Sequence, residues 1–279
     1  MFIAGHTHQA IPSRLTNGML FTQADHFGIH AGRVDLLFDR NSRKRLHREA
    51  SCELMDNRFH FDPVIISRAR SQLAESDRAL SQPIGELAET LHPRSRPGEP
   101  SDIERLIGAA IMEALVERHV RVDGVVHGVF DEKANLITGP KTVSDIWNVI
   151  PYENYIVTAE LTPEEIKAVM EEVYASHERR NFLGFEVKTE GRGYDRRIVS
   201  MTLADGRPLD SGKKYVVAFN TFDSRSAGHH FMKLRALLET SAVNSALHPL
   251  QTRDALVDYF RRHKIVRKIA ATNPLPIAA

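Results

Sequence analysis

Two histidines stand close together near the start of the chain, in the motif Gly5-His6-Thr7-His8. The apolar residues 1–4 precede them and are typical of a short buried strand. Imidazoles at positions i and i+2 beyond a strand end can reach two neighbouring metal ions, and neutral imidazole suits zinc, manganese, iron and cobalt. Gly5 permits a sharp backbone turn before the first histidine. The alternative is that both histidines are solvated loop residues, and the motif alone leaves both interpretations open.

The composition bounds the class of protein. The chain has 279 residues, of which 42% are hydrophobic and 26% charged, which is ordinary for one large or two medium globular domains. The formal net charge of +1 gives no field that would favour a nucleic acid polymer or a membrane surface as partner. No apolar run approaches the 18 or so residues of a membrane-spanning helix, and the composition indicates no particular oligomeric state.

The two ends of the chain and its single cysteine add little about the compartment. Cys52 is the only cysteine, so the chain forms no internal disulfide. A chain that begins directly with a strand leads us to expect that the native protein has further residues upstream, including any export signal. The last residues, 271–279, are rich in proline and alanine and are expected to fray.

Capping signals mark the expected helices. Ser101 with Glu104, and Thr162 with Glu165, have the spacing of capping boxes. Asp62 followed by proline is typical of a helix start, and this helix is interpreted as a connecting one. Helices are predicted over 62–80, 101–115, 143–149, 231–239 and 252–264 and from Thr162 onward. Strands are predicted over 19–24, 32–39, 122–130, 155–161, 184–190, 198–203 and 215–220.

These elements divide the chain into four parts. Residues 1–60 read as the end of a β-rich domain, and residues 61–83 as a linker helix. Residues 84–270 alternate helices and strands, which predicts a mixed α/β domain with mixed sheets and flanking helices. The remainder, 271–279, is a flexible tail.

The N-terminal motif lies in a longer stretch with a family likeness. "FIAGHTHQAIP" at 2–12 resembles the final metal-ligand motif of the calcineurin-like metallophosphoesterases, in particular the 5'-nucleotidases and 2',3'-cyclic-nucleotide phosphodiesterases. "FTQADHFGIHAGRVDLLFD" at 21–39 resembles the closing strands of that domain, so residues 1–60 would be its C-terminal remnant. The resemblance implies that His6 and His8 each bind one of two divalent metals, such as zinc or manganese, that clamp the attacking and leaving oxygens.

The rest of the family's metal ligands have no counterpart in this chain. The resemblance calls for an Asp-x-His, a Gly-Asp and a Gly-Asn-His motif, and we find no substitute for them in the 279 residues. Two imidazoles without carboxylates do not hold two metal ions, because carboxylates bridge the metals and offset their charge. We therefore expect an incomplete metal site, and no hydrolysis of phosphate esters by the chain as given.

The longest likeness covers residues 84–268, which resemble the 5'-nucleotidase C-terminal domain. The segments that carry it are "IGELAETL", "ERLIGAAIMEAL", "DGVVHGVFDE" and "YVVAFNTFDSRSAGHHFMKLR". In that family the domain grips the nucleoside, and two aromatic rings sandwich the base. The matching positions are Tyr152 and Phe222, and Asn154 completes the Pro-Tyr-Glu-Asn match at 151–154. The alternative is that both aromatic residues belong to the core.

The anion-binding residues match less well. Family arginines grip the phosphate and ribose, and Arg96 falls near one of them. At 127–131, "HGVFD" replaces Asn-Gly-Gly-x-Ile-Arg, so that arginine is absent. At 226–230, "SAGHH" replaces the family's Gly-Gly-Asp loop. His230 or Arg225 could still meet a phosphate, the alternative being that both are solvated loop residues.

Three readings of function follow. The first is the nucleotide-recognition part of a metal-dependent phosphoric ester hydrolase of nucleotide catabolism, which the resemblance places in the periplasm or outside the cell. The second is a non-catalytic module that binds nucleosides or nucleotides. The third is a structural or partner-binding domain, which rests only on the ordinary surface charge.

Overall fold

The chain folds into two compact units, Met1–Ala74 and Glu75–Ala279. The computed structural model describes residues 1–270, apart from residues 132, 177, 193–194 and 227–228. The predicted tail 271–279 lies outside the described residues. Mixed sheets with flanking helices confirm the expected α/β class.

Unit 1 consists mainly of β-strands. Its three-stranded sheet has the order β1-β3-β2, with β1 parallel and β2 antiparallel to β3. A second, two-stranded sheet pairs β4 with β5 in antiparallel fashion. The strands predicted over 19–24 and 32–39 are present, whereas β2 and β5 were not predicted. The bounds are β1 Phe2–Ala4, β2 Ala10–Thr16, β3 Met19–Ala24, β4 His30–Phe38 and β5 Arg45–Leu54.

Helix α1, Pro63–Leu80, crosses the boundary between the two units. The Asp62 carboxylate accepts a hydrogen bond from the N–H of Val64 at 2.8 Å, so the predicted cap is confirmed. None of the side chains of α1 is buried. The helix is therefore held by its local hydrogen bonds rather than by a packed apolar face.

A five-stranded sheet forms the centre of unit 2, in the order β10-β7-β13-β9-β14. Strand β13 is parallel to β7, whereas β10 runs antiparallel to β7, and β9 runs antiparallel to β13 and β14. The C-terminal ends of β7, β13 and β14 therefore meet the N-terminal ends of β9 and β10 at one edge, called here the site edge. The bounds are β7 Gly124–His127, β9 Tyr155–Leu161, β10 Asn181–Leu183, β13 Tyr215–Asn220 and β14 Ala246–Gln251.

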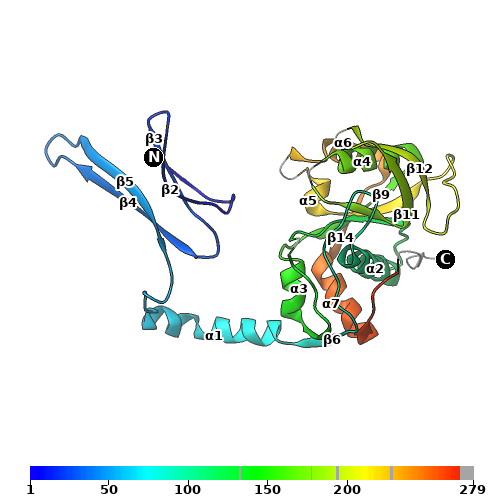
Figure 1. Cartoon of the computed structure of the whole chain (residues 1–279), viewed down its shortest axis with the longest axis horizontal. Coiled ribbons are helices and arrows are strands. Elements are labelled where there is room, and N and C mark those ends of the chain that lie inside the picture. The colour runs from blue at the N-terminus through cyan, green and yellow to red at the C-terminus, as the bar shows by residue number, and fades with distance from the viewer. Residues whose placement is uncertain (132, 177, 193–194, 227–228, 271–279) are drawn as a thin grey trace. The chain divides into compact units, whose positions relative to one another are not determined.

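Helices cover both faces of this sheet (Figure 1). Side chains alternate along its strands, so Ala218 lies in one apolar cluster while its neighbours Val217 and Phe219 lie in the other. The first cluster includes residues of α2, α3 and α7, and the second includes residues of α4 and α6. The bounds are α2 Asp102–Glu117, α3 Val143–Val149, α4 Pro163–Ala175, α6 Met232–Leu238 and α7 Thr252–His263.

The capping signals of the sequence are realised in the two longest of these helices. Ser101 and Glu104 form a reciprocal capping box at α2, and Thr162 and Glu165 form one at α4. The predicted bounds of α3, β9 and β13 agree with the structure. Strand β7 ends at His127, three residues earlier than predicted.

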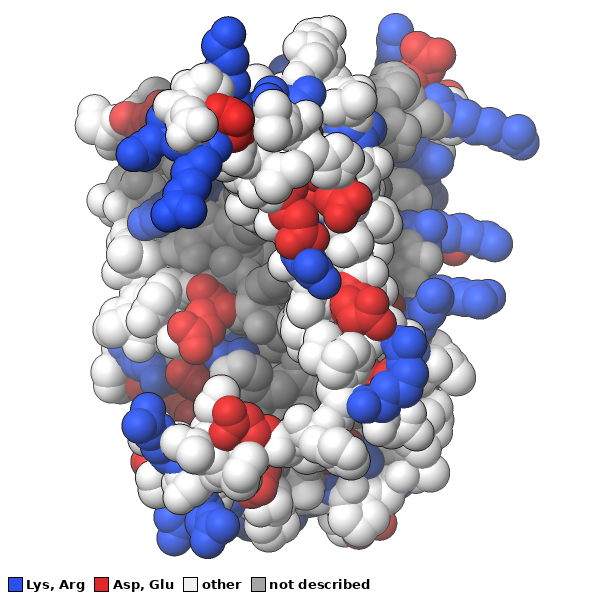
Figure 2. Space-filling model, turned by 90° about the vertical axis from the view of Figure 1, so that its left-hand side faces the viewer, with Lys and Arg blue, Asp and Glu red and all other residues white. Residues whose placement is uncertain are grey.

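Smaller elements complete unit 2. A three-stranded sheet has the order β15-β6-β8, and β11 pairs with β12 as an antiparallel ribbon. Acidic and basic side chains are intermingled on the face shown in Figure 2. Within the described part of the chain, no helix is long and apolar enough to span a membrane. The bounds are β6 Pro83–Leu87, β8 Gly139–Thr142, β11 Phe185–Glu190, β12 Arg197–Leu203, α5 Thr221–Ser224, the 3-10 helix Ser241–Val243 and β15 Ile265–Val266.

Candidate functional site at one edge of the central sheet

Strand pairing brings the segment before β9 next to the short helix after β13. Asn220, the last residue of β13, is the register partner of Ile156 in β9. The hydroxyl of Thr221 accepts the N–H of Tyr155 at 3.1 Å and donates to the Asn154 side-chain oxygen at 3.4 Å. The predicted ligand residues of 151–154 and of α5 are therefore neighbours at the site edge.

The two predicted clamp rings both reach the surface. Tyr152 is 52% exposed and Phe222 is 39% exposed, so neither ring is a core side chain. Phe130 meets Tyr152 edge to face, with ring centroids 5.1 Å apart. This geometry is favourable between aromatic rings, and it orients the Tyr152 ring while leaving ring surface open to solvent.

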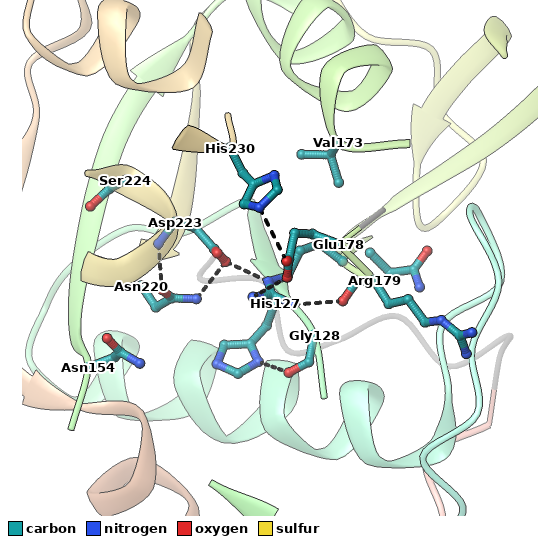
Figure 3. A network of polar contacts seen from close by, with 12 residues as sticks. His127, Gly128, Asn154, Val173, Glu178, Arg179, Asn220, Asp223, Ser224 and His230 are labelled. Atoms are coloured by element: carbon teal, nitrogen blue, oxygen red, sulfur yellow. Dashed lines mark hydrogen bonds and ion pairs between the residues drawn. The ribbon is translucent and has the colours of Figure 1, made fainter. Parts of the chain in front are cut away.

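A buried ion pair lies at this edge, and Figure 3 shows its Asp223 side chain beside Asn220. Arg180 Nε donates to Asp223 Oδ2 at 2.8 Å, and the two side chains are only 3% and 1% exposed. Asn220 Nδ2 also donates to Asp223 Oδ2, at 2.7 Å, and the Asp223 N–H donates back to Asn220 Oδ1 at 2.9 Å. Arg180 Nη2 faces Glu178 Oε2 at 3.5 Å. Such a pair requires this degree of hydrogen bonding, because removing two charges from water is costly.

His127, the last residue of β7, is fully buried beside this pair. Its Nδ1 lies 2.7 Å from the carbonyl oxygen of Gly128, an arrangement that places the proton on Nδ1 and leaves Nε2 as an acceptor. Burial, and then the positive charge of Arg180, lower the pKa of His127 to about 4, so the ring is neutral at pH 7. Several buried polar atoms of this edge have no hydrogen-bond partner among the described residues, among them His127 Nε2, Asp223 Oδ1 and Asn154 Nδ2. Such atoms are typical of places that take a water molecule or a ligand.

A cavity of about 950 Å³ adjoins the ion pair. Its volume is in the range of small-molecule sites. The hydroxyl of Tyr174 lies in its wall, buried and without a hydrogen-bond partner of ordinary geometry in the described part of unit 2, and burial raises the pKa of Tyr174. The ionisable lining is predominantly basic: Arg94, Arg96, Arg179 and Arg180 against Glu99 and Glu178.

The predicted anion ligands occupy different positions around this cavity. Arg96 lies in its wall and faces Glu99 at 3.8 Å. His230 approaches Glu178 at 3.6 Å, so Glu178 connects it to the cavity (Figure 3). Arg225 is exposed at the end of α5. The loop predicted at 226–230 includes two residues outside the described ones. The structure thus places Arg96 and His230 around one cavity and does not place Arg225 in its wall.

The N-terminal histidines lie in unit 1. His6 and His8 are both exposed, and the His8 ring stacks on His26 with centroids 4.6 Å apart. Thr7, which separates His6 from His8, exchanges hydrogen bonds with the Gln23 side chain at 2.8 and 3.0 Å. These bonds anchor the motif to β3. Among the residues the structure describes, no three His, Cys, Asp or Glu side chains are arranged to hold a metal. The donors present therefore do not fit the two-metal site that the resemblance implies.

Sequence reasoning did not single out Arg180 or Asp223. The sequence does contain one signal for such a residue. The arginine that the family has near position 131 is absent, which raises the question of which other arginine approaches this edge. In the structure Arg180, the residue before β10, approaches this edge. A Cβ atom on Gly128 would lie 2.8 Å from Arg180 Nη1, which shows how closely the guanidinium approaches the end of β7.

Known proteins resemble this chain over most of its length. The uncharacterized metallophosphoesterase YunD of Bacillus subtilis is 23% identical over 267 residues, which are 93% of this chain and 54% of that protein. Endonuclease YhcR of the same species is 21% identical over 244 residues, 85% of this chain and 19% of that protein. The chain thus spans about half or less of the length of these relatives.

Solved structures share the fold. A putative 5'-nucleotidase from Staphylococcus aureus superimposes with a TM-score of 0.67 at 17% identity, covering 99% of this chain and 54% of that one. The 5'-nucleotidase precursor from Thermus thermophilus gives a TM-score of 0.59 at 20% identity, covering 90% of this chain and 50% of that one. Residues 83–236, more than half of the chain, match the family model for the 5'-nucleotidase C-terminal domain. The chain therefore belongs to the 5'-nucleotidase C-terminal domain family, as its sequence motifs predicted.

Proposed function

We propose that unit 2 binds a nucleotide at the site edge and acts as the substrate-recognition part of a phosphoric ester hydrolase. The observation that carries this proposal is the exposure of two aromatic rings, Tyr152 and Phe222, from adjoining segments at the end of one sheet. Stacking of a base on an aromatic side chain contributes about 1–3 kcal/mol. The buried polar atoms His127 Nε2, Asp223 Oδ1 and Asn154 Nδ2 of the same edge have no hydrogen-bond partner among the described residues, which supports a bound polar group there.

The arginine-lined cavity is our candidate for the phosphate end of the same ligand. Phe130 contacts Tyr152, and Arg180 Cζ lies 5.3 Å from the Phe130 ring centroid. Because Arg180 also lines the cavity, the clamp and the cavity are separated by only two side chains. Arg96 can offer a phosphate paired N–H donors from the cavity wall.

Our proposal for this chain is recognition rather than hydrolysis. Two divalent metals would supply the activated hydroxide of the reaction, but His6 and His8 have no carboxylate partners arranged for a metal in the described part of unit 1. The second candidate function, a nucleotide-binding module without chemistry, is favoured by this incomplete donor set. Sequence directly upstream in the genome discriminates, because an in-frame Asp-x-His and Gly-Asn-His would restore the hydrolase.

Isothermal titration calorimetry of the purified chain tests the proposal. We expect adenosine to bind, and AMP to bind more tightly than adenosine because the phosphate adds contacts with the cavity. Titrations with 2',3'-cyclic AMP and inorganic phosphate, compared with the titration with AMP, show whether the cavity binds a phosphate monoester dianion more tightly than these other forms of phosphate. Phe222→Ala should weaken adenosine about 5- to 150-fold, the equivalent of one stacking contact.

A matched control lies in unit 1. Phe27 is an exposed phenylalanine that the site does not include, so Phe27→Ala should leave adenosine binding unchanged. Failure of both adenosine and AMP to bind would refute the assignment, as would equal affinities for wild type and Phe222→Ala.

A further inference from the structure

The first strand residue of β10 and the residue before it contact two different ligand-bearing segments of unit 2. Arg180 contacts the base-clamp side of the site edge, and Asn181 contacts the loop 94–100 that carries Arg96. Asn181 is held in register opposite His127 of β7. Because successive side chains of a strand point in opposite directions, two adjacent residues can contact two separate segments.

Arg180 contacts a residue next to each of the two rings, Asp223 beside Phe222 and Phe130 beside Tyr152. Its partner Asp223 follows Phe222 directly in α5, at a distance of 2.8 Å between Arg180 Nε and Asp223 Oδ2. On its other side the guanidinium lies over Phe130, which in turn packs edge to face on Tyr152. The arginine charge is already balanced by a buried carboxylate. The side chain is therefore placed to fix the two rings relative to each other rather than to stack on the base.

Asn181 forms a hydrogen bond with the loop 94–100 that carries Arg96. Its Oδ1 accepts the N–H of Gly98 at 2.9 Å, within the loop 94–100. Its Nδ2 donates to the buried carboxylate of Glu104 at 3.2 Å. Glu104 in turn accepts the N–H of Ser101 at 2.7 Å and the hydroxyl of Ser95 at 3.3 Å. The loop is therefore attached to one asparagine–glutamate pair at Ser95, at Gly98 and, just beyond its end, at Ser101.

We propose that Arg180 and Asn181 are positioning residues for the two halves of the ligand site. Arg180 positions the rings of Tyr152 and Phe222, called here the base clamp, and Asn181 positions the loop 94–100 with Arg96, called here the anion loop. This inference rests on the proposed function. It predicts that the two halves can be weakened separately, which a purely structural role would not allow.

Calorimetry with two half-ligands tests this separation. Adenosine reports the base clamp, and inorganic phosphate reports the anion loop. Arg180→Lys keeps the charge in the cavity wall but not the guanidinium geometry that contacts Asp223 and Phe130. It should weaken adenosine at least about fivefold and should weaken phosphate by a smaller factor. Asn181→Ala should do the reverse, and AMP should weaken in both variants.

Two further variants keep the test valid if a single substitution unfolds the protein. Arg180→Met combined with Asp223→Leu removes both buried charges together, and should lose adenosine affinity more than Arg180→Lys does. Asn181→Ser keeps a small polar side chain at the second position. Folding of each variant is checked by far-UV circular dichroism and by the fluorescence of Trp147, the only tryptophan of the chain.

The outcomes separate this inference from the function on which it rests. Wild-type protein that binds neither half-ligand overturns both. Wild-type binding combined with variants that weaken both half-ligands equally, or neither, overturns only the positioning roles. Opposite selectivity of the Arg180 and Asn181 variants supports them.

Discussion

The buried pair of Arg180 and Asp223 predicts a large loss of stability when one partner alone is neutralised. In Asp223→Asn the guanidinium stays buried and keeps its hydrogen bond to the Arg179 carbonyl oxygen at 3.0 Å. Among the described residues its remaining acidic partner is Glu178, 3.5 Å away and itself 33% exposed. Breaking a buried pair by removing one partner costs about 3–5 kcal/mol, because a charge is left uncompensated. Glu178 retains part of the compensation, so we expect the free energy of unfolding of unit 2 to fall by about 3 kcal/mol.

Urea denaturation followed by tryptophan fluorescence measures this loss. Trp147 is the single tryptophan and lies on α3, with Arg253 Cζ 3.4 Å from its ring centroid, so its emission reports unit 2. With a typical slope of about 1–3 kcal/mol per molar urea, the midpoint should fall by about 1 M or more. The matched control is Glu239→Gln, which removes an exposed ion pair with Arg235 and should cost less than about 1 kcal/mol. If Asp223→Asn costs no more than this control, the reasoning about the buried pair is wrong.

Three other predictions concern neighbouring features. Gly128→Ala should destabilise unit 2 severely, since its Cβ would lie 2.0 Å from the carbonyl oxygen of Arg179; Gly212→Ala, whose Cβ meets only a flexible carboxylate at 3.3 Å, is the control in the same denaturation assay. The pKa of His127 is about 4 in the folded protein, against an ordinary value of 6.5. The contribution of the neutral, buried imidazole to the free energy of unfolding is therefore fully present above pH 6.5. It is lost as the pH falls from about 6.5 to 4, by on the order of 3 kcal/mol. A pH series of melts should show a shallower slope for His127→Gln, and equal slopes would contradict the neutral buried imidazole. The chain supplied with manganese or zinc should release no phosphate from AMP, and metal-dependent turnover would show that its ligand set is complete.

Local signals in the sequence predicted much of the scaffold. The capping boxes at Ser101 and Thr162 fixed two helix starts, because their hydrogen bonds involve residues only three positions apart. The bounds of β9 and β13 were also predicted, because both segments are rich in the apolar and β-branched residues that favour buried strands. The exposed rings of Tyr152 and Phe222 occur at the strand ends where the family likeness placed a ligand.

The contacts beneath the rings could not be predicted in the same way. Arg180 and Asp223 are 43 positions apart, and they meet only because β10 and β13 both flank β7. The loop with Arg96 and the end of α4 enclose a cavity through packing, which no periodic pattern encodes. Long-range pairing of strands therefore decides which polar residues share the site edge.

A crystal structure of the chain with AMP would test the central claim most directly. We expect the adenine ring between Tyr152 and Phe222, with the phosphate in the cavity beside Arg96. Adenine bound away from both rings, or a phosphate held elsewhere on the chain, would contradict it.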